Sequence, residues 1–189
     1  MLETIRMHYE IVDFVIDIVQ NSCEAGASLV ELNIDEDDEG IGFEIRDNGK
    51  GMDAIQQLRA LDPYVTDGVK HPGRKVGLGL PFLKQALEQS GGNFKLESEK
   101  GRGTKLFFRF NTRNLDCPPL GDLVGMIVTV LCMPGPAEML IGRSRGRNSY
   151  LVRKSELIAA LENLEEVSNL VLLKEYVRSQ EEGVRLWQG

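Results

Sequence analysis

A carboxylate on the buried side of a strand constrains this chain more than any other feature. From Ile41 to Asp47 apolar residues alternate with others, which is typical of a half-buried strand. The period of two puts Asp47 on the same side as Phe43 and Ile45, and that side faces the core. A buried carboxylate without donors costs on the order of several kcal/mol, so Asp47 needs a partner. The glycines of Asn48–Met52 allow a backbone to approach a ligand closely, although a simple hairpin turn explains them equally well.

The surrounding pattern alternates between the helical period and the strand period. Gly26 is placed to end the first helix, and a glycine-rich stretch from residue 63 to 79 separates the second helix from the third. This order predicts an α/β two-layer sandwich over residues 1–113. The predicted helices are 8–25, 53–61 and 80–89, and the predicted strands are 29–34, 41–47, 94–98 and 105–110.

The remainder, residues 114–189, reads as a small α+β domain whose role the pattern does not reveal. Pro118-Pro119 makes a reasonable linker, and two short alternating runs around residues 138–152 predict a hairpin. Ser155 and Ser168 are suitable N-caps for two final helices, which carry enough Leu and Val to pack on the first domain or on a second copy. The turn Arg143–Arg147 is expected to be solvated, although it could dock an acidic partner.

Composition excludes several classes of function. The 189 residues carry a formal net charge of −7, which disfavours general binding to nucleic acid or to an anionic membrane. Residues 59–113 are nevertheless basic, so a small polyanion remains a possible ligand. Apolar runs are too short for a membrane span, and no secretory signal is evident. Three cysteines without a C-x-x-C pair are typical of a cytoplasmic protein.

Two further segments could carry chemistry. The polar face of the first helix has acids and amides only, with Asp17 and Asn21 one turn apart. Asp17 could orient or deprotonate a nucleophile and Asn21 could bind Mg²⁺, although a solvated stripe is the simpler interpretation. The run from Gly73 to Leu80 leads into a helix, where free backbone N–H groups and nearby cations favour an anion. A flexible surface loop is the alternative there.

Taken in order, these motifs resemble the GHKL ATPase superfamily of DNA gyrase, the heat-shock ATP-dependent chaperone, histidine kinases and MutL proteins. Asp17–Ala27 resembles its N-box in a form similar to MutL, and Asp47–Met52 its D-x-G-x-G box. The stretch from residue 63 to 79 and the strands up to Phe110 resemble the lid and closing strands of histidine kinases. The resemblance covers residues 8–110 and implies the Bergerat-type ATP-binding fold, with helices on one face of a mixed sheet.

The resemblance also implies residue roles. Asn21 would coordinate Mg²⁺ that bridges the phosphates of ATP, Asp47 would accept the adenine amino proton, and Asp17 stands where many members carry a catalytic Glu. Gly77 and Gly79 would line the triphosphate. The full set that the resemblance places around ATP is Asn21, Asp47, Gly49, Gly51, Met52, Lys70, Lys75, Gly77, Leu78, Gly79, Leu80 and Thr104.

The resulting expectation is a bacterial Mg-ATP-binding protein that acts as a histidine- or serine-kinase-like enzyme or as a slow ATPase. A kinase would act on a separate phosphoacceptor protein, because no dimerising phosphoacceptor helix pair is recognisable. The alternative is a nucleotide-gated interaction module with little turnover, similar to small ATPase-domain proteins encoded among hydrogenase genes. A homodimer is compatible with either interpretation, and a DNA-linked ATPase is disfavoured.

Overall fold

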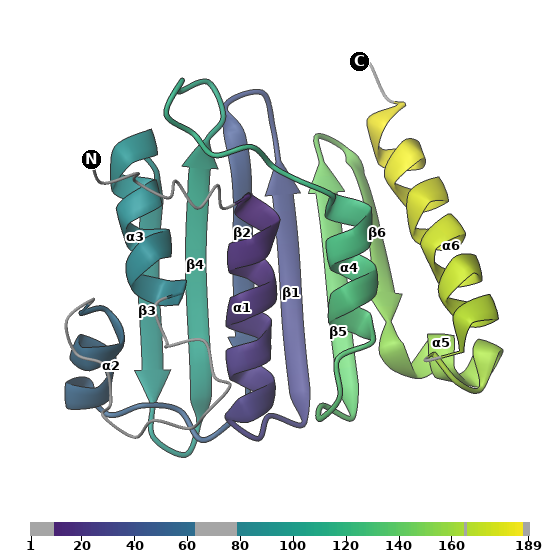
Figure 1. The fold of residues 1–189 in the computed structure, drawn as a ribbon, viewed down its shortest axis with the longest axis horizontal. Helices are drawn as coiled ribbons and strands as arrows, with labels where there is room; N and C mark the ends of the chain where they lie inside the picture. The colour runs from purple at the N-terminus through teal and green to yellow at the C-terminus, as the bar shows by residue number, and fades with distance from the viewer. Residues whose placement is uncertain (1–9, 63–78, 165, 187–189) are drawn as a thin grey trace, which may run out of the picture.

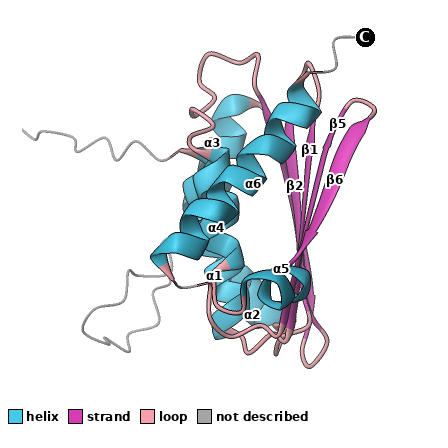
Figure 2. Ribbon diagram, turned by 90° about the vertical axis from the view of Figure 1, so that its right-hand side faces the viewer, coloured by secondary structure: helices cyan, strands magenta, loops and turns pink. Residues whose placement is uncertain are grey.

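The computed structural model describes residues 10–62, 79–164 and 166–186. It is a two-layer α/β sandwich in which one six-stranded mixed sheet carries the described helices on one face (Figures 1 and 2). The strand order is β3-β4-β2-β1-β5-β6, and neighbouring strands are antiparallel except for the parallel pair β1 and β5. The predicted fold class is therefore confirmed.

The first half of the chain forms the elements that the periodicity predicts. They are α1 (Ile11–Glu24), β1 (Leu29–Glu36), β2 (Gly40–Asp47), α2 (Ala54–Ala60), α3 (Gly79–Ser90), β3 (Asn93–Glu99) and β4 (Gly103–Asn111). Gly26 follows α1 with φ of +75°, a backbone conformation that favours glycine and ends the helix. Asp53 caps α2 by accepting a hydrogen bond from the backbone N–H of Gln56.

The second half continues the same sheet across the boundary expected at residue 113. It consists of α4 (Leu123–Leu131), β5 (Glu138–Arg145), β6 (Asn148–Arg153), α5 (Lys154–Leu161) and α6 (Val167–Arg185). β5 lies directly beside β1, and the apolar side of α4 belongs to the same buried cluster as α1 and the sheet. The expected linker also contacts α1, since the backbone N–H of Ile11 donates to the carbonyl of Pro119. The division into two domains stays a prediction.

The core lies between the sheet and its helices. Phe14, Ile18 and Val19 of α1 are buried against the inner side of the sheet, where Phe43 and Phe108 stack with ring centroids 5.1 Å apart. Burying side chains of this size contributes about 1.5–3 kcal/mol each before entropy is counted, so α1 is held firmly. Its next turns therefore present Asn21 and Ser22 at a defined place near the end of β2.

Two expected helix starts in the second half are wrong. α5 has Arg153 rather than Ser155 at its N-cap, and α6 has Glu166 rather than Ser168. β6 runs into α5 without an intervening loop, so the backbone enters the helix before Ser155 is reached. At α5 the preference of serine for N-caps is therefore weaker than this constraint from the preceding strand.

The expectation that Arg143 is solvated is also wrong. Strand parity puts it on the covered side of β5, where it is only 1% exposed, and α6 packs over it. Its Nε donates to Oε1 of Glu181 at 3.2 Å, and its other guanidinium nitrogens contact Glu36 and the carbonyl of Ser144. The hydroxyl of Tyr150 donates to the same Glu181 oxygen at 2.6 Å. Burial and the neighbouring Glu181 carboxylate raise the pKa of Tyr150 above its ordinary value.

Candidate functional site

Three polar side chains lie in one row at the end of the sheet. The register pairs Asp47 of β2 with Thr104 of β4, and Thr104 with Ser98 of β3. All three are on the helix-covered side, in agreement with the strand parity expected for Asp47. The Ser98 and Thr104 hydroxyl oxygens are 2.9 Å apart, and the backbone N–H of Met52 donates to Ser98 at 2.8 Å. This hydrogen bond holds the segment after β2 against the sheet.

Asp47 is buried, at 8% exposure, and its donors come from two elements. The Ser22 hydroxyl on α1 donates to Oδ2 at 2.8 Å, and the backbone N–H of Gly49 donates to Oδ1 at 2.9 Å. A carboxylate can accept about four hydrogen bonds, so these two donors leave capacity for a ligand. Both donors are neutral, which leaves the charge of Asp47 available to a hydrogen-bond donor that enters the site.

A cavity of about 280 Å³ opens beside this carboxylate. Its apolar wall comes from the core side of the sheet, and its polar groups come from α1, from the segment after β2 and from the start of α3. The lining residues are Ile18, Asn21, Ser22, Ala25, Ile45, Asp47, Lys50, Gly51, Met52, Ala60, Gly79, Leu80, Leu96, Thr104 and Leu106. A mostly apolar cavity with a few convergent polar groups suits a planar ligand that carries hydrogen-bond donors.

The two glycines after Asp47 have structural reasons to be glycine. Gly51 has φ of +58°, and a Cβ there would lie 2.0 Å from the carbonyl oxygen of Glu99. A Cβ on Gly49 would lie 2.9 Å from that of Ala25 on the loop after α1. Close approach to the protein's own backbone therefore explains both residues, and the turn they form lets Met52 and Lys50 reach the cavity.

Most of the predicted site residues that fall in the described part of the chain lie close together in the structure. Asn21, Asp47, Gly51, Met52, Gly79, Leu80 and Thr104 line one cavity. Gly49 lies next to it and donates to Asp47. Lys70, Lys75, Gly77 and Leu78 lie outside the described residues. Asp17 is half-buried and packs against Gly79, since a Cβ on Gly79 would lie 1.7 Å from Oδ2 of Asp17.

Sequence reasoning missed Ser22 and Ser98. Ser22 lies among the buried residues of α1, yet it is the side-chain donor to Asp47. The signal was present, because a buried hydroxyl on an apolar face requires a hydrogen-bond partner. Ser98 could have been found from strand parity, which aligns it with Leu96 and places it toward the covered side.

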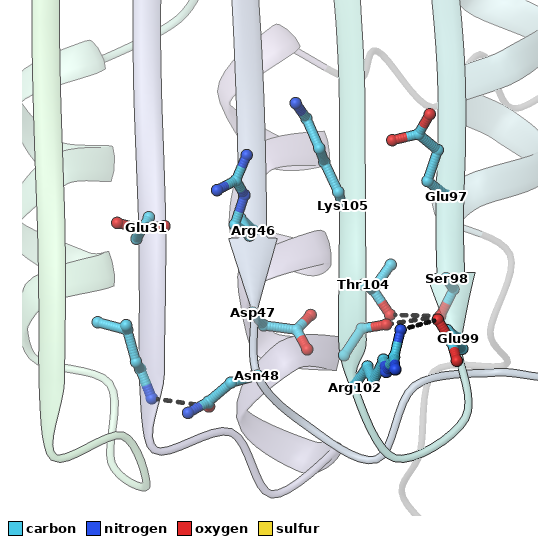
Figure 3. Close-up of a pocket in the computed structure, with 12 residues that line it drawn as sticks. Glu31, Arg46, Asp47, Asn48, Glu97, Ser98, Glu99, Arg102, Thr104 and Lys105 are labelled. Carbon is cyan, nitrogen blue, oxygen red and sulfur yellow. Dashed lines mark hydrogen bonds and ion pairs between the residues drawn. The ribbon is translucent and has the colours of Figure 1, made fainter.

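A second hollow, of about 460 Å³, lies near the same end of the sheet and reaches its open face (Figure 3). In register across four strands it carries Glu31, Arg46, Lys105 and Glu97. These charges are mostly compensated locally: Arg46 and Lys105 both pair with Glu44, at 3.7 and 3.0 Å. This hollow therefore resembles a solvated, salt-bridged surface more than a ligand site.

No group of three or more His, Cys, Asp or Glu side chains that could hold a metal ion occurs in the described part of the chain. Within the same residues, no helix is long and apolar enough to cross a membrane. The amide oxygen of Asn21 at the cavity is a hard ligand that a divalent cation could share with a bound molecule.

Comparison with known proteins identifies sensor kinases as relatives of part of the chain. The alginate biosynthesis sensor protein KinB of Pseudomonas aeruginosa is 26% identical over 106 residues, which are 56% of this chain and 17% of KinB. The sensor histidine kinase RcsC of Escherichia coli is 28% identical over 51% of this chain and 10% of its own length. The sensor kinase CckA of Brucella abortus is 30% identical over 68% of this chain and 15% of its own length. This chain thus spans a small fraction of each relative.

Among solved structures, the catalytic domain of histidine kinase ThkA superposes with a TM-score of 0.41 at 19% identity, covering 52% of this chain and 64% of that domain. The family model described as histidine kinase-, DNA gyrase B-, and HSP90-like ATPase matches residues 8–114, which include α1, the Asp47 row and β4. The chain belongs to this family of ATPases, known as GHKL.

Proposed function

We propose that this protein binds Mg·ATP in the cavity beside Asp47 and uses it as a kinase or as a slow ATPase. The observation that carries the proposal is the state of Asp47: a buried carboxylate with two neutral donors and spare acceptor capacity at the wall of an apolar cavity. The adenine amino group is a donor that suits this acceptor, while Met52, Leu96 and Leu106 offer apolar contacts to a ring.

The phosphates would extend from the adenine toward Gly79 and Leu80. Both residues line the cavity and begin α3, and the backbone N–H groups in the first turn of a helix favour an anion. Asn21 lines the same cavity and offers one hard oxygen ligand. Among the described residues Asn21 is the oxygen ligand proposed here, so Mg²⁺ would bind together with the phosphates and water. Lys70, Lys75, Gly77 and Leu78 complete the proposed phosphate region.

The terminal phosphoryl group would pass either to a hydroxyl or imidazole of an acceptor protein or to water. In such transfers the protein mainly positions groups and balances charge. Asp17 is proposed as the acid–base group, since it lies one turn from Asn21 on the polar face of α1. We propose a bacterial, cytoplasmic setting with a protein partner, without nucleic acid or membrane, and with self-association into a homodimer. A link to hydrogenase gene clusters stays a prediction.

The contact between Asp17 and Gly79 also favours a second candidate function. A carboxylate that packs against the protein's own backbone is poorly placed to activate an attacking group, so turnover could be negligible. The protein would then be a nucleotide-gated interaction module, whose bound state is recognised by a partner.

The fate of γ-labelled phosphate separates these candidates. The purified protein is incubated with Mg·ATP alone and with cell lysate, with the Asp17→Asn variant in parallel. Label on a second protein that disappears with the variant supports a kinase, and Asp17-dependent free phosphate supports an ATPase. Label that remains in bound ATP, equally in both proteins, supports the module. Absence of ATP binding in the unmodified protein contradicts the proposal.

A further inference from the structure

Ser98 of β3 makes three hydrogen-bond contacts through a single hydroxyl group. Its oxygen accepts from the backbone N–H of Met52 at 2.8 Å, and it lies 3.0 Å from the carbonyl oxygen of Gly103 and 2.9 Å from the hydroxyl oxygen of Thr104. Met52 and Thr104 line the cavity, and Ser98 lies one strand further from Asp47 than Thr104 does (Figure 3). The serine hydroxyl therefore joins two residues of the cavity wall from behind.

The number of available hydrogen atoms determines the direction of these bonds. A serine hydroxyl has one hydrogen and can accept two hydrogen bonds. The carbonyl of Gly103 cannot donate, so the hydrogen in this contact is that of Ser98. The backbone of Met52 supplies its own hydrogen, and the second lone pair of Ser98 then accepts from the hydroxyl of Thr104. This assignment gives each of the three contacts a hydrogen.

Thr104 consequently presents lone pairs, and no hydrogen, to the cavity. Its single hydrogen is directed to Ser98, so its oxygen can accept from a ligand but cannot donate to it. Asp47 is in register with Thr104 across β2 and β4, lines the same cavity, and is an acceptor as well. This part of the cavity wall therefore carries two acceptors from adjacent strands.

We propose that Ser98 is a positioning residue that sets the base specificity of the cavity, because it keeps Thr104 an acceptor. A base with an amino group at this edge offers hydrogens to the two acceptors, whereas a base with a carbonyl there presents a third acceptor to them. The inference rests on the proposed function, because it assumes that the base of the nucleotide lies beside Asp47. It narrows the substrate class to nucleotides of 6-aminopurines, as opposed to 6-oxopurines.

The test measures the affinities for ATP and for inosine triphosphate in the unmodified protein and in Ser98→Ala, by titration calorimetry at fixed Mg²⁺. Without the serine hydroxyl, the Thr104 hydroxyl is free to turn and donate to the carbonyl of the inosine base. The ratio of the ATP affinity to the inosine triphosphate affinity should therefore fall about fivefold, the size expected for one hydrogen bond. A general loosening of the site would weaken both nucleotides alike and leave the ratio unchanged.

Three further variants keep the test independent of folding. Ser98→Thr keeps a hydroxyl at the same strand position and should retain the ratio of the unmodified protein. In a Thr104→Val background there is no hydroxyl to orient, so the addition of Ser98→Ala should no longer change the ratio. Ser90→Ala removes a buried hydroxyl that bonds to carbonyls of its own helix and should leave the ratio unchanged.

A ratio that is unchanged in Ser98→Ala, an equal fall in Ser98→Thr or Ser90→Ala, or loss of both nucleotides by Ser98→Ala would overturn the inference and leave the proposed function standing. The same fall on adding Ser98→Ala to Thr104→Val would also overturn it. Absence of ATP binding to the unmodified protein would overturn both the inference and the proposed function.

Discussion

Two carboxylates are buried among the residues that the structure describes, and their surroundings differ in a way that separates structure from function. Glu181 of α6, at 3% exposure, is held by the guanidinium of Arg143 and by the hydroxyl of Tyr150. Asp47, at 8% exposure, is held by the hydroxyl of Ser22 and by the backbone N–H of Gly49. A cation neutralises the first carboxylate, whereas neutral donors leave the second with its charge.

The difference shows why burial alone does not identify a site. Glu181 is enclosed by β5, β6 and its own helix, and its cation belongs to the protein. Asp47 lies at the wall of a cavity of about 280 Å³, so a ligand can reach it. In the described part of the chain Oε2 of Glu181 also has no hydrogen-bond partner, so spare acceptor capacity does not separate the two carboxylates. Access from a cavity does, and it is the arrangement expected for ligand recognition. The Arg143 cluster instead fixes α6 to the sheet.

The largest effect on the free energy of unfolding is expected where the buried ion pair between Arg143 and Glu181 is broken. Arg143→Ala should lower the free energy of unfolding by about 3–5 kcal/mol, because Glu181 and Glu36 would lose their buried counter-charge. Chemical denaturation measures this loss. Arg145→Ala is the matched control, since Arg145 is 42% exposed and 3.7 Å from Glu36, and it should cost no more than about 1 kcal/mol. Similar losses in both variants would contradict the structural role of the cluster.

The corresponding change at the site should leave stability nearly intact and remove function. Asp47→Asn is expected to weaken ATP binding by about 100-fold or more, because an amide N–H₂ would face the adenine amino group. Its stability should fall by only about 1–2 kcal/mol, since the two neutral donors can still be accommodated. Calorimetry with ATP and a denaturation curve test both parts. ATP affinity equal to that of the unmodified protein would remove the adenine assignment.

A smaller effect is expected when the neutral donor is removed. Ser22→Ala should cost about 1 kcal/mol of stability and weaken ATP binding several-fold, because Asp47 would lose one hydrogen bond and some of its orientation. Ser90→Ala is a suitable control, because its buried hydroxyl bonds only to carbonyls of its own helix. ATP binding as weak in the control as in Ser22→Ala would show that the Ser22 contact has no special role.

Periodicity in the sequence was sufficient to predict the local elements and the side on which Asp47 lies. It could not predict that β5 would pair in parallel with β1, because that pairing joins segments about a hundred residues apart. The burial of Arg143 was missed for a similar reason: its partner Glu181 lies on the last helix, and an arginine in an expected turn is predicted to be exposed. Ser22 was missed because a single hydroxyl scarcely alters the apolar face of a helix.

The resemblance to known motifs predicted more of the site than physical patterning did. Asn21, Asp47 and Thr104 lie far apart in the chain, and no local pattern shows that they share one cavity. The strand period predicted the side of the sheet on which Asp47 lies, and helix electrostatics predicted a preference for an anion at the start of α3. The role of Ser98, which links Met52 and Thr104, depended on a register that only the structure reveals.

The most direct test of the account compares ATP with inosine triphosphate on the unmodified protein. Inosine carries a carbonyl oxygen where adenine carries the amino group, so a carboxylate there would face an acceptor instead of a donor. The account predicts that ATP binds about 100-fold more tightly and that Asp47→Asn abolishes most of this preference. Equal affinities for the two nucleotides in the unmodified protein would contradict the assignment of Asp47 to the adenine amino group.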